Sequence, residues 1–242
     1  MVLSFVVSDL HAHVINMVFV LALLGVLMAI FRKLQARVDS GWQAKTLLDE
    51  VFFPELLLPG FLIGIFQMSN FWDFPIYLTV TLFTLLCAGI RQYGFTRKML
   101  WTAAARFFIV VLLSLVFAFP FNQTFEKVAT NIRLAQDHSL PHQLLVLWGY
   151  QLVFAVIFFI YILFTEQNHV WKKARGKERE RIRKELTLIT RIRNVLEKFT
   201  IEDVFAVILF VSAIGLVLIP ELVYVEDIYT GEHKRANTMF KL

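Results

Sequence analysis

The chain has 242 residues, of which 58% are hydrophobic and 18% are charged, and its net charge is +5. This composition excludes an ordinary soluble domain and indicates an integral membrane protein. A disulfide within the chain is also excluded, because Cys87 is the single cysteine.

Apolar segments that suit membrane-spanning helices recur along the whole chain. A helix needs about 20 mostly apolar residues to cross a bilayer. The stretch 56–90 is too long for one span and is interrupted at Asp73 and Pro75, so we expect two shorter helices joined by a polar turn. The sequence therefore predicts an all-α, polytopic bundle of about six transmembrane helices in a single domain, 1–242, with spans at 14–31, 56–69, 76–90, 101–119, 144–164 and 204–219.

The lysines and arginines predict the orientation of this bundle. If the chain starts outside, the first two inside segments hold four basic residues each, and the polar stretch from Lys172 to Lys198 holds eleven. The outside segments hold five, so the positive-inside rule favours an extracytoplasmic N-terminus. The apolar start carries no basic residue before Arg32, which is unlike a cleaved signal peptide. Five of the six histidines then lie outside, together with the polar motifs described below.

The segment 165–200 is the only long polar region. Its apolar residues recur every three or four positions among lysines and arginines, which predicts a basic amphipathic helix on the cytoplasmic side. Such a helix could lie on anionic lipid headgroups or act as a solvated connector. We expect no nucleic-acid partner, because the segment lies between two spans.

Asp9, His11 and His13 stand at alternate positions before the first span. In an extended segment all three point the same way, whereas on a helix only Asp9 and His13 share a face. Carboxylate and imidazole groups together suit a divalent metal ion or proton transfer. The alternative is a helix N-terminus, with Ser8 or Asp9 as the cap and the histidines in the headgroup layer.

Residues 70–75 place the carboxylate of Asp73 between two apolar helices, where a charge is costly unless it is partnered or faces water. Trp72 and Tyr77 are most simply interface aromatics. Asn70 or Asp73 could also cap the following helix, with Pro75 in its first turn. A cap and a functional carboxylate are not exclusive.

Acidic, basic and aromatic residues mix in the predicted extracytoplasmic tail, residues 220–242. Lys234 and Arg235 could clamp a phosphate or pyrophosphate, and the acidic residues could hold a metal or support these bases. The alternative is an ordinary exposed tail. The candidate substrate-binding residues of the tail are Glu221, Tyr224, Asp227, Lys234, Arg235 and Asn237.

Three of these motifs, in this order, resemble those of a known family. Residues 4–14, SFVVSDLHAHV, resemble its FSF-x-x-x-DLH-[AP]-HV stretch, and residues 70–77, NFWDFPIY, resemble its N-x-WD-[FY]-P-x-Y motif. Residues 221–241 resemble its E-[LF]-x-Y-x-x-D … R-x-NT-x-FK segment, with Ala236 where a methionine is usual. The chain is thus similar to the prokaryotic YYY membrane-protein family, domain of unknown function 2298.

The resemblance implies a distant relation to the C-type (GT-C) membrane glycosyltransferases. These enzymes take sugars from lipid-phosphate donors at the extracytoplasmic face, often with acidic residues that bind a divalent metal or activate the acceptor. In that interpretation Asp9 is either a ligand for Mg²⁺ or Mn²⁺ or a general base. His11 and His13 position Asp9 or share the metal. Asp73 is a second acid, and Lys234 with Arg235 holds the phosphate of a polyprenyl-phosphate sugar. Asn70, Trp72 and Tyr77 join the tail residues as candidate substrate-binding groups.

The resemblance also implies a prokaryotic plasma-membrane location and an internal portion of a longer protein, whose flanking helices are then expected partners beside the lipid bilayer. A transporter or permease-like module is the alternative function, and a non-catalytic fragment is a third. Transport predicts ionisable residues near the bilayer midplane. Here the acids lie at helix ends, and Arg106 is the one charge well within an apolar run.

Overall fold

The computed structural model describes residues 12–70, 72–125, 131–136, 138–173 and 199–226. It confirms the predicted helical membrane protein: the described residues include five helices that are long and apolar enough to cross a membrane, and one shorter apolar helix. The chain divides into two compact units, Met1–Ala135 with Phe205–Leu242, and Gln136–Val204.

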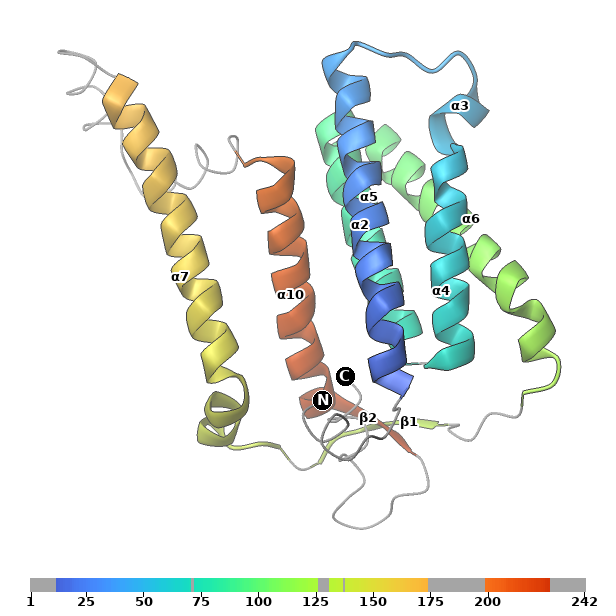
Figure 1. Cartoon of the computed structure of the whole chain (residues 1–242), viewed down its shortest axis with the longest axis vertical. Coiled ribbons are helices and arrows are strands. Elements are labelled where there is room, and N and C mark those ends of the chain that lie inside the picture. Colours follow the sequence, from blue (N-terminus) through green and yellow to red (C-terminus); the bar gives the residue numbers. More distant parts are fainter. Residues whose placement is uncertain (1–11, 71, 126–130, 137, 174–198, 227–242) are drawn as a thin grey trace. The chain divides into compact units, whose positions relative to one another are not determined.

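Four helices pack together in the first unit: α2 (Ala12–Asp39), α4 (Leu57–Ser69), α5 (Asp73–Tyr93) and α6 (Arg97–Asn122). Helices α4 and α5 each contact the other three. Two short helices, α3 (Leu47–Val51) and η1 (Pro54–Leu56), connect α2 to α4. Consecutive helices among these four run in opposite directions (Figure 1). The starts of α2 and α5 therefore lie at the same end as the ends of α4 and α6.

The closest helix packing is between α4 and α6. A Cβ atom added at Gly60 would lie 2.5 Å from Cβ of Leu113, and one added at Gly64 would lie 3.1 Å from the carbonyl oxygen of Ser114. The two glycines stand four residues apart and so share a helix face. Small residues at such spacing let membrane helices approach backbone to backbone, which is what fixes α4 against α6.

The six expected spans fall on α2, α4, α5, α6, α7 (Pro141–Lys173) and α10 (Ile201–Leu222), and most of the helices are longer than expected. Helix α2 continues beyond the apolar run to Asp39 because its basic and amide residues are good helix formers and because Leu34 is fully buried. The helix ends at Asp39, and Gly41 in the turn that follows has a φ of 65°, which suits glycine. Helix α7 likewise continues to Lys173, and residues 174–198 of the expected amphipathic helix lie outside the described residues.

Two short strands were not predicted. Strand β1 (Asn131–Leu134) pairs antiparallel with β2 (Val223–Glu226), which follows α10 directly, and Arg133 lies opposite Tyr224. Helix α10 itself begins with a capping box. The Thr200 backbone N–H donates to the Asp203 carboxylate at 3.0 Å, and the Asp203 backbone N–H donates to the Thr200 hydroxyl oxygen at 3.2 Å.

Candidate functional site

A buried carboxylate lies where α2, α4 and α5 meet, and we call its surroundings the Asp73 cluster: Asn16, Ser69, Asn70, Asp73 and Tyr77. Asn16 Nδ2 donates a hydrogen bond of 2.7 Å to Asp73 Oδ2, and Ser69 Oγ lies 2.7 Å from Asn16 Oδ1. Asn16 is fully buried and Asp73 is 8% exposed. The cluster therefore links a polar residue from the first span to the turn that the sequence singled out.

Asp73 does not cap α5 as proposed from the sequence, and neither does Asn70. The N-cap residue is Trp72, which makes no side-chain cap hydrogen bond, and Asn70 instead ends α4. The reason is that Trp72 already has helical backbone angles, so the Asp73 amide donates to the Asn70 carbonyl and the carboxylate turns towards Asn16. Pro75 does lie in the first turn of α5, as expected.

Among the described residues, one hydrogen bond to the Asp73 carboxylate is seen. A carboxylate offers about four lone-pair sites. Within the described part of the chain, the hydrogen bond from Asn16 is the one that the Asp73 side chain accepts. As the first residue of α5, Asp73 also lies at the positive end of the helix dipole, where anionic groups are commonly found. Such a group can act as a general base or as a ligand for a divalent cation.

The two aromatic candidates near Asp73, Tyr77 and Trp72, have different surroundings. Tyr77 lies one turn after Asp73 and packs its ring against Phe66, with 5.1 Å between ring centroids. Trp72 is half-buried at the start of α5. Tyr77 is thus part of the helix packing as well as a neighbour of the carboxylate.

The remaining predicted site residues fall mostly outside the described part. His13 is the second residue of α2, and its side chain is not described. Glu221 lies at the end of α10, and Tyr224 is buried in β2. The described residues contain no group of three potential metal ligands. The predicted residues outside the described ranges are Asp9, His11, Asp227, Lys234, Arg235 and Asn237.

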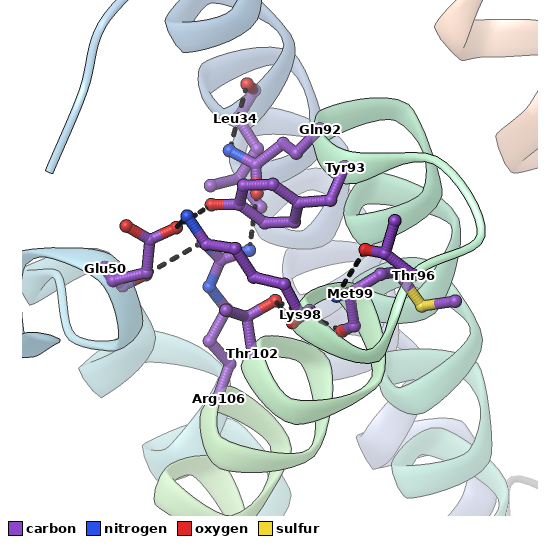
Figure 2. Close-up of polar contacts among 9 residues, drawn as sticks. All are labelled: Leu34, Glu50, Gln92, Tyr93, Thr96, Lys98, Met99, Thr102 and Arg106. Atoms are coloured by element: carbon purple, nitrogen blue, oxygen red, sulfur yellow. Dashed lines mark hydrogen bonds and ion pairs between the residues drawn. The ribbon is translucent and has the colours of Figure 1, made fainter.

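A second polar group, the Arg106 cluster, lies at the opposite end of the helices and comprises Glu50, Gln92, Tyr93, Lys98 and Arg106 (Figure 2). Arg106 is fully buried, and its guanidinium donates to the Glu50 carbonyl oxygen at 2.9 Å and to Gln92 Oε1 at 2.8 Å. Tyr93 donates its hydroxyl to the Glu50 carboxylate, and Lys98 Nζ lies 3.0 Å from the same oxygen. The cluster thereby ties the α2–α4 connection to α5 and α6.

Glu50 is held in its charged form by this cluster. Burial raises the pKa of the Glu50 carboxyl, but hydrogen bonds from Tyr93 and Lys98 and the charges of Lys98 and Arg106 outweigh that effect and hold the pKa below its usual value. Its role is therefore that of a structural anion, not of a proton donor at neutral pH.

Sequence reasoning missed Asn16 as a member of the Asp73 cluster, and most members of the Arg106 cluster. Asn16 had one signal, because it is an amide inside an otherwise apolar run, and such groups seek a partner within the bundle. Arg106 was noticed as a charge within a span, but its partners Glu50 and Gln92 come from segments 56 and 14 residues away, so spacing alone could not find them.

The fold and these two clusters define a multi-pass helical membrane protein with buried polar groups at both ends of its helices. The family model described as "Uncharacterized membrane protein (DUF2298)" matches residues 2–242, so the chain belongs to this family. Comparison with curated proteins finds no match, and comparison with solved structures finds none either. The expected relation to the C-type glycosyltransferases stays a prediction.

Proposed function

We propose that the chain forms part of a membrane glycosyltransferase that takes its sugar from a lipid-phosphate donor at the extracytoplasmic face of a prokaryotic plasma membrane. The observation that carries the proposal is the Asp73 carboxylate, which is 8% exposed and, among the described residues, accepts one hydrogen bond, from the neutral side chain of Asn16. An ionisable group buried in a membrane bundle is costly to keep and is therefore a functional candidate by default.

The location of Asp73 supports this chemistry. It lies at the helix end shared with the start of α2, and the basic residues gather at the opposite end, which the positive-inside rule assigns to the cytoplasm. Lipid-linked sugars at the outer face would meet the Asp73 end. A carboxylate there can accept the proton of an attacking acceptor hydroxyl.

The other residues have roles in the proposal that follow from their chemistry. Lys234 and Arg235 would hold the donor phosphate, because a lysine and an arginine offer several charged N–H donors to its oxygens. Asp9, His11 and His13 have the donor types that would bind a divalent ion such as Mg²⁺ or Mn²⁺, which would neutralise phosphate charge when bound.

The experiment is to exchange Asp73→Asn in the full-length protein in its native cell and to compare glycolipid and glycoprotein profiles. Asn keeps the shape of the side chain and an acceptor for Asn16, so loss of a glycan from the profile with normal insertion would support the proposal. Asp39→Asn is the matched control, because Asp39 is exposed at the other end of α2 and is bonded by Gln35. Unchanged profiles in both Asp73→Asn and Asp9→Asn would contradict the proposal.

A further inference from the structure

Three cations surround one buried ring near the Arg106 cluster. Phe53 is 2% exposed, and its ring centroid lies 5.3 Å from the Arg37 guanidinium, 5.6 Å from Lys33 Nζ and 5.9 Å from the Arg106 guanidinium. Each cation gains some stabilisation from the ring face. The ring carries no charge, however, so it leaves their mutual repulsion uncompensated.

Each of the neighbouring carboxylates already forms an ion pair with a lysine, although Glu55 Oε2 has no hydrogen-bond partner among the described residues. Glu55 accepts a hydrogen bond from Lys33, and Glu50 is paired with Lys98. Arg106 uses neutral oxygens, those of Gln92 and the Glu50 backbone. The charge of Arg37 acts on Glu55 at a distance, its guanidinium lies over the rings of Trp42 and Phe53, and its buried Nη1 has no hydrogen-bond partner within the described ranges. Four cations therefore share two carboxylates.

Arg37 is also held in a fixed position. The Trp42 amide donates to the Arg37 carbonyl at 2.9 Å and the Gly41 amide donates to the Val38 carbonyl at 3.0 Å, a pattern that closes the end of α2. This turn brings the Trp42 ring back to 4.3 Å from the Arg37 guanidinium. An arginine held between two rings with N–H groups left over is preorganised to bind an oxyanion with little loss of side-chain entropy.

The surface beside Arg37 has the character of a lipid interface. Trp42 is 42% exposed. Large apolar side chains of the α2–α4 connection and of the start of α4 are exposed as well: Leu47, Leu48, Phe52, Leu57 and Leu58. Tryptophan and apolar side chains beside cations are typical of the level at which phospholipid headgroups lie, and basic pockets between spans bind such headgroups.

We infer that Arg37, with Lys33 and Trp42, forms a binding site for the phosphate group of an anionic phospholipid at this end of the bundle. The phosphate would accept hydrogen bonds from Arg37 and offset the excess positive charge around Phe53. The lipid tails would lie against the exposed leucines and Phe52. This site is separate from the Asp73 cluster and does not depend on the proposed glycosyltransferase activity.

The test is native mass spectrometry of the full-length protein in detergent with phosphatidylglycerol or phosphatidylcholine added. We expect the wild type to bind phosphatidylglycerol in preference to phosphatidylcholine, and Arg37→Gln to lower the affinity for phosphatidylglycerol about tenfold, the loss expected for a charged hydrogen bond. Arg97→Gln removes the same charge from an exposed position at the same end and should leave the affinity unchanged. Circular dichroism checks that each variant keeps its helices.

Several outcomes would overturn the inference. They are equal binding of the two lipids by the wild type, an equal loss in Arg97→Gln, and displacement of the lipid by millimolar inorganic phosphate, which would mean a site for free phosphate. If Arg37→Gln loses its helical signal, Arg37→Lys replaces it. Lysine keeps the charge but not the planar fork of arginine. Arg37→Lys should therefore bind phosphatidylglycerol more weakly than the wild type and Arg97→Gln, but more strongly than the lipid-independent background. Wild-type affinity in Arg37→Lys would contradict the site.

Discussion

Replacing Gly60 by alanine should force α4 away from α6. The added Cβ atom would lie 2.5 Å from Cβ of Leu113, about 1 Å inside the optimal separation of two carbon atoms. Because Leu113 Cβ is fixed to the backbone of α6, no rotamer change relieves the clash, and the helices must separate. Overpacking of this kind costs about 1–3 kcal/mol.

Gly25→Ala is the matched control for this prediction. Gly25 also lies inside a helix, and an added Cβ would meet nothing within 4 Å. Both exchanges gain about 1 kcal/mol of helix propensity, so the difference between the two variants isolates the steric cost and should be about 1–3 kcal/mol. The assay is the free energy of unfolding in mixed micelles, from titration with a denaturing detergent.

A second exchange makes the test specific to Leu113. Leu113→Ala retains the clashing Cβ atom, so it should not restore the stability that Gly60→Ala loses. Leu113→Gly removes that atom, so Gly60→Ala should lower the free energy of unfolding less in a Leu113→Gly background than in the wild type. The packing argument would be refuted if Gly60→Ala were as stable as Gly25→Ala, or if Leu113→Ala rescued it as well as Leu113→Gly.

Three further predictions concern the Arg106 cluster and the topology. Arg106→Leu should lower the free energy of unfolding by about 3 kcal/mol, because the oxygens of Gln92 and Glu50 lose their buried donor. The control Arg97→Leu changes an exposed arginine and should alter the free energy little. Equal losses in the two variants would contradict the buried network. Because the pKa of Glu50 is lowered in the folded protein, its stabilisation is complete above the usual glutamate pKa of about 4.3 and is lost as the pH falls through the lower folded value. Glu50→Gln should therefore flatten the pH dependence of unfolding below that pH, and an unchanged slope would show that Glu50 does not titrate this way. In a Cys87→Ala background, a membrane-impermeant maleimide added to intact cells should label Gln123→Cys and not Lys45→Cys, and the reverse pattern would invert the proposed orientation.

The sequence was sufficient for the class of fold, because hydropathy reports directly on membrane insertion. The break between α4 and α5 was also predictable, since Asn70, Asp73 and Pro75 cannot continue an apolar helix without cost. The extension of α2 to Asp39 was not, because charged residues after an apolar run continue a helix or leave it according to tertiary packing, here that of Leu34.

The candidate site was predictable only in part. Asp73 was identified because a carboxylate between apolar helices is unusual, but its partner Asn16 is 57 residues away and depends on how α2 packs against α5. The same limit applies to strands β1 and β2, whose four-residue lengths and pairing across about 90 residues or more carry no periodic signal. Local pattern therefore marks which residues are costly to bury, and only the fold shows what partners them.

The measurement that bears most directly on the proposed function is consumption of a lipid-linked sugar donor by proteoliposomes of the full-length protein. Polyprenyl-phosphate glucose and polyprenyl-phosphate mannose would each be supplied, with membrane extract from the native cell as the source of acceptor. If Asp73 is the proton acceptor, wild type and Asp39→Asn should consume one of the donors at equal rates, and Asp73→Asn should be about a hundredfold slower, the scale of general-base catalysis. Donor consumption by Asp73→Asn at the wild-type rate, or no consumption of either donor by the wild type, would contradict the proposal.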